Sequence, residues 1–189
     1  MELGLRGRSG AFSYDSAIFS MNFSNQIVNQ SLASGISKAN GGKSLHQGAE
    51  ASLGYELGRG WAISANATYI PVAKFVGTNS LGRDGNRIPY TPKLTSNLGV
   101  NYEKNGFNTL VSLNYVSAQY ADSANTMVQN TIGTLGEVPA FATVNWSANY
   151  AINKDWKVFG VINNVFDKRY ISSRSPDGIF AGAPLNFQA

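Results

Sequence analysis

The feature that most constrains this chain is a strict alternation of apolar and polar residues. It recurs in five segments: "AEASLGYEL" (49–57), "WAISANATY" (61–69), "LTSNLGVNY" (94–102), "LVSLNYV" (110–116) and "FATVNWSANY" (141–150). Successive side chains of a β-strand point to opposite sides, so each segment has one apolar and one polar face. Helical periodicity is hard to find anywhere in the chain. The pattern therefore predicts an all-β protein.

Three less regular segments extend the strand pattern. They are "ELGLRGR", "AFSYDSAIFSMNF" running on toward "NQIVNQSLA", and "WKVFGVINN". The second mixes its faces around Asp15, and the third is apolar on both faces at Phe159, Val161 and Ile162. Together with the regular segments they predict about eight strands, and a ninth can begin at "PLNFQA".

Short and long connections alternate between these segments. The short ones, "RSG", "LGRG", "EKNG" and "INKD", have the Gly, Asn and Asp content of tight turns. The long ones are "SGISKANGGKS", "GTNSLGRDGNRIPYTPK", "DSANTMVQNTIGTLGEVP" and "FDKRYISSRSPDGIFAGAP". Outer-membrane barrels alternate in this way, because their short turns and long loops face different sides of the membrane. We therefore expect an antiparallel up-and-down sheet with all its short turns at one end.

Composition favours a membrane barrel over a soluble one. Charged residues make up only 14% of the chain and aromatic residues 12%, and there is no cysteine. No apolar run approaches the roughly 18 residues of a membrane helix, but a membrane strand needs only about 9–11 residues. A soluble barrel needs a charged outer face, whereas the polar faces here carry mainly Ser, Thr, Asn and Gly. On the pattern alone, a soluble β-barrel stays open as an alternative.

The alternation also predicts which side chains face lipid. Aromatic residues near the strand ends fit the interfacial girdles of a membrane barrel. Glu50 and Glu56 are expected to face the lumen. In the segment 61–69, the residues expected to face lipid are Trp61, Ile63, Ala65 and Ala67, and those expected to face the lumen are Ser64, Asn66 and Thr68.

The stretch "INNVFDKRY" resembles the "NLFDxxY" element that precedes the last strand of TonB-dependent outer-membrane receptors, with Val165 in place of the usual Leu. "GAP" and the apolar-polar run that follows it, Gly182 to Phe187, match the start of the terminal strand of that family. "ADSANT", "GTLGEVPAF" and "NQIVNQSLASG" resemble the ferric-citrate-type branch less specifically. The motif is interpreted as a structural corner rather than a ligand site, and its residues are Asn163, Asn164, Val165, Phe166, Asp167 and Tyr170.

The resemblance implies a fold, a location and partners. Such receptors have a barrel of about 22 strands that surrounds an N-terminal plug domain. The chain shows neither a plug nor a TonB-box-like start, and it stops at "NFQA". We therefore expect residues 1–189 to be the C-terminal part of a receptor barrel in the Gram-negative outer membrane, with the lipid, the plug and, through the plug, the TonB complex as partners. A self-contained small barrel, porin-like or adhesive, is the alternative.

An enzymatic function finds little support. His46 is the only histidine of the chain, which rules out a His-rich metal site within it, and no motif frames a catalytic serine near it. Glu50 and Glu56 are about 20 Å apart along a strand, too far for an acid/base pair. The Lys and Arg residues are scattered rather than gathered, so nucleic-acid binding is not expected.

Uptake of a ferric chelate is the function that the resemblance implies, with the iron carried as chelated substrate and no cofactor of the protein's own. Ferric siderophores and ferric citrate are anionic, and Arg and amide groups in the long loops suit an anion. The candidates are Arg83 and Arg87 in one loop, Asn125 and Gln129 in the next, and Arg174 in the last.

Overall fold

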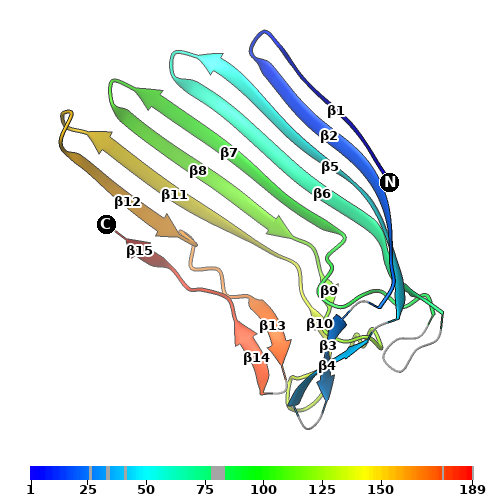
Figure 1. The fold of residues 1–189 in the computed structure, drawn as a ribbon. Helices are drawn as coiled ribbons and strands as arrows, with labels where there is room; N and C mark the ends of the chain where they lie inside the picture. Colours follow the sequence, from blue (N-terminus) through cyan, green and yellow to red (C-terminus); the bar gives the residue numbers. More distant parts are fainter. Residues whose placement is uncertain (26, 33–34, 41, 78–83, 176, 189) are drawn as a thin grey trace.

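The computed structural model describes residues 1–25, 27–32, 35–40, 42–77, 84–175 and 177–188. Among these residues, nine strands form one antiparallel sheet in the order β1-β2-β5-β6-β7-β8-β11-β12-β15 (Figure 1). The two edge strands, β1 and β15, do not pair with each other within the described part of the chain, so the sheet is open. Its strands are β1 (Glu2–Ser9), β2 (Phe12–Phe23), β5 (Lys43–Gly58), β6 (Trp61–Val76), β7 (Leu94–Lys104), β8 (Phe107–Val116), β11 (Phe141–Ala151), β12 (Lys157–Asn163) and β15 (Asn186–Gln188).

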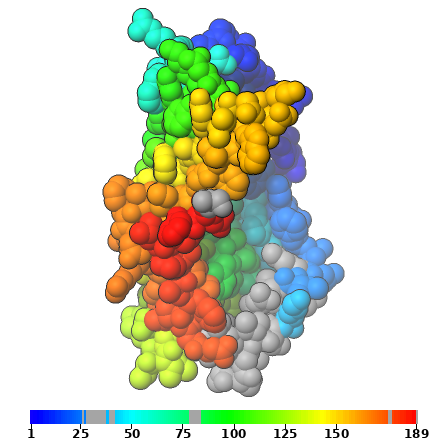
Figure 2. Space-filling model, turned by 90° about the vertical axis from the view of Figure 1, so that its left-hand side faces the viewer, coloured from blue at the N-terminus to red at the C-terminus, as the bar shows by residue number. Residues whose placement is uncertain are grey.

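The sheet confirms the predicted up-and-down topology. Each strand pairs antiparallel with the next strand of the sheet order. The short turns β1–β2, β5–β6, β7–β8 and β11–β12 gather at one end, and the long connections lie at the other (Figure 1). Figure 2 shows the same separation from the β15 side, with the amber β11–β12 turn at the top and the yellow-green segment around residue 130 at the bottom. Among the described residues, no helix is long and apolar enough to cross a membrane.

Three small hairpins form inside the long connections. They are β3 (Ile27–Leu32) with β4 (Gly35–Asn40), β9 (Gln119–Tyr120) with β10 (Glu137–Val138), and β13 (Ile171–Ser175) with β14 (Gly178–Ala181). The sequence predicted long polar connections here and named no strand in most of them, and it predicted that the second strand runs on toward "NQIVNQSLA". The second prediction was wrong, because β2 ends at Phe23 and β3 pairs with β4 in a separate sheet. A long polar segment can satisfy its backbone N–H and C=O groups by pairing with itself.

The long connections cover one face of the sheet, and this identifies its two sides. Ser44 and Phe75 are direct cross-strand partners and are 2% and 0% exposed, respectively. Side chains at every second position of β5 share the face of Ser44, including His46 and Ser52. We call this face the inner face and the opposite one the outer face. Ser64, Asn66 and Thr68 pair with Gly54, Ser52 and Glu50 of β5 and lie on the inner face, whereas Trp61, Ile63, Ala65 and Ala67 lie on the outer face.

A β-bulge in β6 interrupts the alternation. Tyr69 pairs with Ala49, but Val72 pairs with Gln47, so β6 contains one extra residue at Ile70–Pro71. Proline has no N–H to continue a ladder, which suits such a position. The bulge reverses the facing of the rest of β6, and this is why the odd-numbered residues Ala73 and Phe75 turn inward.

Beyond the bulge, a returning loop replaces β7 as the neighbour of β6. The Phe75 N–H donates to the carbonyl oxygen of Asn86 at 2.9 Å, and the Ile88 N–H donates to that of Ala73 at 2.8 Å. Ala73, Phe75, Ile88, Ala121 and Val138 are all buried. The apolar core of the described residues therefore lies mainly under the long connections, and the sheet between the two ends keeps both faces accessible.

Candidate functional site

The inner face is a wall of uncharged hydrogen-bonding side chains. Asn66 pairs with Asn97, Asn97 with Asn114, and Asn114 with Thr143, so four strands present amides and a hydroxyl at one level. Asn97 Nδ2 donates to Asn114 Oδ1 at 2.6 Å. Amide side chains offer both donors and acceptors without a net charge. Such a wall can hydrogen-bond a polar solute or protein surface without fixing it through one strong ion pair.

The first strands add charges to the same face. Register places six charged side chains there: Glu2, Arg6, Arg8, Asp15, Glu50 and Glu56. The inward direction of Glu50 and Glu56 follows from the Ser44 side of β5, as the alternation predicts. Arg8 Nη2 lies 2.6 Å from Glu56 Oε1 near the short turns, and both side chains are largely exposed. A hollow of about 340 Å³ lies between Asp15, Glu50 and Asn66.

Arg87 stabilises the bulge of β6. Its guanidinium group donates to the carbonyl oxygens of Ile70 (2.6 Å), Pro71 (3.0 Å) and Thr91 (2.8 Å). Asn125 holds the backbone of Arg87 on both sides, since its Oδ1 accepts from the Arg87 N–H at 2.7 Å and its Nδ2 donates to the Arg87 carbonyl oxygen at 2.8 Å. The structure thus brings together two candidate residues from two different loops.

Arg174, in the last long connection, is bonded to residues of the long connection before it. It is 5% exposed, and its guanidinium group donates to the carbonyl oxygens of Gly133 (2.8 Å) and Glu137 (3.0 Å) and to Gln129 Oε1 (3.2 Å). Tyr90 closes the group, because its hydroxyl donates to the Arg174 carbonyl oxygen and accepts from the Arg174 N–H. We call these five residues the Arg174 cluster. Burial raises the pKa of the Tyr90 hydroxyl, which keeps it a neutral donor.

The predicted ligand residues therefore meet in two pairs, Arg87 with Asn125 and Gln129 with Arg174. Both guanidinium groups are engaged with oxygens of the chain itself, and this gives each a structural role. Arg83 lies outside the described residues. No ligand contact follows from these bonds, so ligand binding by the five candidates stays a prediction.

A small hollow lies beside Arg87, and the sequence did not predict it. Its volume is about 230 Å³, and its lining includes Arg87, Lys93, Gln119, Tyr120 and Glu137 from four parts of the chain. Lys93 is exposed and makes no ion pair with a described residue. The position of Lys93 immediately before an alternating strand was the available signal. Two cations stand beside amide and hydroxyl groups and the single carboxylate of Glu137, so the charged groups of the lining are positive on balance, a setting in which an anion can bind.

The Asn163–Tyr170 motif forms a tight corner at the end of β12. Asn164 is 3% exposed and has a backbone φ of 51°, a left-handed conformation that Asn tolerates well. Its side chain donates to the carbonyl oxygens of Lys168 and Ala183, both at 3.0 Å, and accepts from the Lys168 N–H at 2.9 Å. Asp167 Oδ1 accepts from the Leu185 N–H at 3.0 Å. These bonds fix the chain between β12 and β15.

The remaining motif residues anchor the corner to the sheet. Asn163 donates to Asn186 Oδ1 at 3.0 Å. The Val165 N–H donates to the carbonyl oxygen of Val144 at 2.8 Å. The Tyr170 ring stacks on Phe141 at 4.1 Å between centroids. The ring of Phe166 is exposed. Every one of these contacts is made to the chain itself, which is the arrangement of a structural corner.

The neighbourhood of His46 does not form a hydrolase site. His46 Nε2 lies 3.2 Å from Ser44 Oγ. The ring of Phe23 is in edge contact with the imidazole at 5.2 Å between centroids, and Met21 and Ala73 are its cross-strand partners. A triad needs a carboxylate or amide that orients the imidazole, and within the described part of the chain no such hydrogen bond to His46 is seen. Among the described residues, no three His, Cys, Asp or Glu side chains gather where they could hold a metal ion.

Comparison with known proteins assigns the sheet to a family. Residues 1–165 match the model of the TonB dependent receptor-like β-barrel. The chain belongs to this family. Members of the TonB-dependent receptor barrel family lie in the Gram-negative outer membrane, which decides against the soluble-barrel alternative. That the outer face of the sheet is the side toward lipid stays a prediction.

Individual TonB-dependent receptors resemble the chain over most of its length. The pesticin receptor of Yersinia pestis is 26% identical over 152 residues, which are 78% of this chain and 21% of that receptor. The crystal structure of the unliganded ferric citrate transporter FecA superposes on 98% of this chain and 29% of its own, with a TM-score of 0.82 and 27% identity. The ferric yersiniabactin uptake receptor FyuA of Yersinia pestis, with a TM-score of 0.70 and 21% identity over 99% of this chain and 27% of its own, shares the fold. The chain thus spans less than a third of each of these proteins.

Proposed function

We propose that residues 1–189 are the C-terminal barrel part of an outer-membrane receptor that takes up a ferric chelate with energy from TonB. The observation that carries the proposal is the family match over residues 1–165, joined to the 27% identity with a ferric citrate transporter over 98% of the chain. The short span relative to these proteins supports the view that a plug domain and further strands complete the receptor.

The inner face suits this role physically. A translocation path needs weak, repeated contacts, and the row of amides from Asn66 to Asn114 supplies them. In the complete receptor this wall surrounds the plug, and the plug connects the barrel to TonB. The iron enters as chelated substrate, without a cofactor of the protein's own. The chain performs no catalysis in this proposal, in keeping with its homologues, which are transport receptors.

The anionic chelate is proposed to approach through the long connections. Arg83, Arg87, Asn125, Gln129 and Arg174 remain the candidate ligand residues, and we add Lys93 to them. Lys93 is the sharper candidate, because its ammonium group is exposed in a hollow and free of ion pairs with described residues, whereas the guanidinium groups of Arg87 and Arg174 are occupied.

Uptake of radiolabelled iron tests the proposal. The complete receptor would be expressed in a strain lacking its own siderophore receptors, with ferric citrate, a ferric catecholate and a ferric phenolate offered separately. We expect uptake of one of these chelates, abolished when TonB is deleted. Uptake that persists without TonB, or no uptake of any chelate by a correctly assembled receptor, contradicts the proposal. Lys93→Gln should raise the half-saturating concentration of the chelate, whereas Lys154→Gln, at a short turn, should not.

A further inference from the structure

A trench of small side chains crosses the outer face of the first strands. Direct cross-strand pairing aligns Ser16 with Ala51, Ala51 with Ala67, and Ala67 with Ser96, so four neighbouring strands carry only small groups at one level. Ala49 and Ala65 lie on the same face, two residues away from Ala51 and Ala67. The outer face is elsewhere rich in large apolar side chains, so this row is a depression in it.

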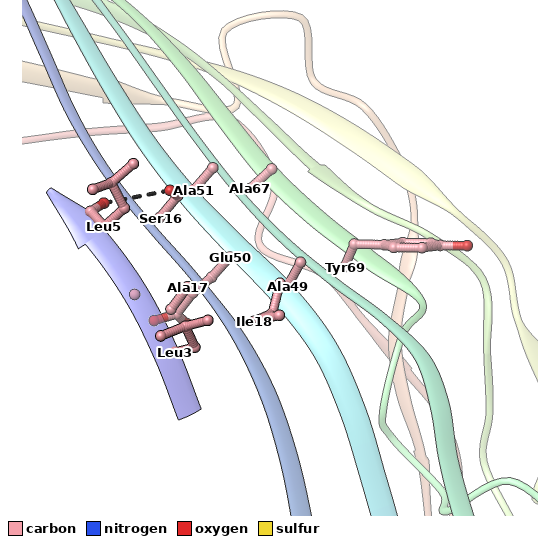
Figure 3. A pocket seen from close by; sticks show the side chains of 11 residues that line it. Leu3, Leu5, Ser16, Ala17, Ile18, Ala49, Glu50, Ala51, Ala67 and Tyr69 are labelled. Atoms are coloured by element: carbon pink, nitrogen blue, oxygen red, sulfur yellow. Dashed lines mark hydrogen bonds between the residues drawn. The ribbon is translucent and has the colours of Figure 1, made fainter. Parts of the chain in front are cut away.

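Two hollows lie along the trench. One hollow of about 660 Å³ is lined by Ala49, Ala51 and Ala67, with larger side chains at its edges (Figure 3). A second hollow of about 220 Å³ also includes Ala51 and Ala67 and continues toward β7 and β8. In Figure 3, Leu3 and Leu5 of β1 lie on one side of the alanines and Tyr69 lies on the other. The large side chains that border the two hollows are Leu3, Leu5, Ile18, Leu53, Tyr69, Leu98 and Leu113.

The larger hollow, on the face predicted to meet the membrane, has a lining that fits an acyl chain. Its lining is almost entirely apolar, and the exposed rims include Leu3, Ile18 and Tyr69. An unfilled groove forfeits the dispersion contacts that a close-packed neighbour would make. An acyl chain is apolar and flexible, so it can fill a hollow of methyl groups between larger side chains.

Two lysines mark where the head group of such a molecule would lie. Lys43 and Lys74 stand on the outer face beyond Tyr69, toward the long connections, since Lys43 pairs with Val76 and Lys74 pairs with Leu45. They are diagonal neighbours, a few ångströms beyond direct cross-strand distance. Both are exposed, and neither forms an ion pair with a described residue.

A hollow with mixed polar and apolar lining lies beside Lys43. It measures about 340 Å³ and includes Asn22, Ser24 and Lys43 in its lining. On β2, Asn22 of this hollow is six residues from Ser16 of the trench, or ~20 Å at the rise of a strand, and on β5 Lys43 is eight residues from Ala51, or ~26 Å. Basic side chains near a membrane surface attract anionic lipid head groups. The apolar and the basic parts are thus in line along the same strands.

We propose that the outer face of β1, β2, β5 and β6 binds one phosphorylated membrane lipid, with its phosphate at Lys43 and Lys74 and an acyl chain in the trench of Ser16, Ala51, Ala67 and Ser96. The inference depends on the barrel and its facing, and it is independent of which chelate the receptor takes up. Failure of iron uptake would leave it intact, and failure of lipid binding would leave the uptake proposal intact.

Native mass spectrometry of the complete receptor in neutral detergent tests the proposal. The probes are phosphatidylglycerol and phosphatidylcholine with identical acyl chains. We expect retention of one phosphatidylglycerol per receptor and weaker binding of phosphatidylcholine. In the double variant Lys43→Gln/Lys74→Gln, affinity for phosphatidylglycerol should fall at least about tenfold, given roughly 1 kcal/mol per basic residue near a membrane surface. Lys104→Gln, at the short-turn end, is the matched control and should bind like the parent.

The trench is tested separately by filling it. Ala51→Leu and Ala67→Leu add apolar bulk on the lipid side and should weaken binding of the same lipid, whereas Ala148→Leu, on the outer face of β11, should not. Heat-modifiable gel mobility confirms assembly of each variant. Equal affinity of the lysine variant and the parent, equal binding of the two lipids, or full displacement of the lipid by inorganic phosphate would each overturn the proposal. If the trench variants fail to assemble, the lysine variant and the head-group comparison still decide it.

Discussion

The backbone N–H of Asn164 donates a hydrogen bond to the side-chain Oδ1 of Asn145 at 2.9 Å. This bond joins the residue that follows β12 to the middle of β11, on the inner face. With the bonds from Asn164 to Lys168 and Ala183, it makes one buried asparagine the centre of the corner before β15. These bonds support the prediction that the motif is a structural corner.

Asn164→Ala should lower the stability of the barrel by about 2 kcal/mol, because several buried donors and acceptors lose their partners together. Asn164→Gly retains the positive φ without strain, so it isolates the side-chain bonds and should be nearly as damaging. Lys168→Ala removes an exposed side chain from the same turn and should change little. The temperature at which the heat-modifiable band converts measures all three. Parent-like stability of Asn164→Gly would assign the role of Asn164 to its backbone angle alone.

Arg174→Lys should loosen the long connections without disturbing the sheet. A lysine cannot reproduce the fork of donors that reaches Gly133, Glu137 and Gln129. With a loss on the order of 2 kcal/mol, amide hydrogens of residues 129–137 should exchange roughly 30-fold faster. Arg169→Lys, at an exposed arginine, is the control. Unchanged exchange in this segment would mean that the Arg174 cluster does not hold the loops.

The stability of the folded protein should depend on alkaline pH through Tyr90. Burial raises its pKa, so the folded protein favours the neutral hydroxyl more than the unfolded chain does. Its contribution to stability is complete below the ordinary tyrosine pKa of about 10 and is lost as pH rises through the higher folded value. Tyr90→Phe should remove this part of the alkaline loss. Chemical denaturation of parent and variant between neutral pH and above pH 10 measures the difference, and parallel curves would contradict the assignment.

The isolated chain should not transport. β1 and β15 are edge strands, and no described strand pairs with their outward N–H and C=O groups. An unpaired backbone group costs several kcal/mol in lipid. Expressed alone in a strain without siderophore receptors, residues 1–189 should give background uptake of every ferric chelate. Uptake clearly above background, abolished by deleting TonB, would show that this segment is sufficient by itself.

Most of the fold could be predicted from the alternation of apolar and polar residues. Segments such as 61–69 and 94–102 became strands in which the alternating residues share faces as expected, because a register shift of one residue would move every polar side chain to the opposite side. The bulge was missed because period two was followed only up to Tyr69. Pro71 was its signal, since proline within a run marks a bulge or an edge.

The contacts between the long connections could not be predicted from the sequence, for a different reason. Arg87 and Asn125 are 38 residues apart, and Arg174 and Gln129 are 45 apart. Loop residues of this kind have no periodicity, so nothing in the sequence states which loop packs on which. Their residue types suggested anion binding, whereas the structure shows the two arginine side chains bonded to the chain itself. Lys93 became a candidate only when folding placed it in a hollow beside Arg87.

The assignment of the outer face of β6 to lipid can be tested by two neighbouring substitutions in the complete receptor. Ala65 lies on the outer face and Asn66 on the inner face, at the middle of the same strand. Ala65→Arg should sharply reduce the amount of assembled receptor in the outer membrane, because a charge near the bilayer midplane costs roughly 2–4 kcal/mol. Asn66→Arg should assemble nearly as well as the parent. Outer-membrane levels measured by heat-modifiable gel shift would contradict the account if both variants were lost equally, or if Asn66→Arg were lost more.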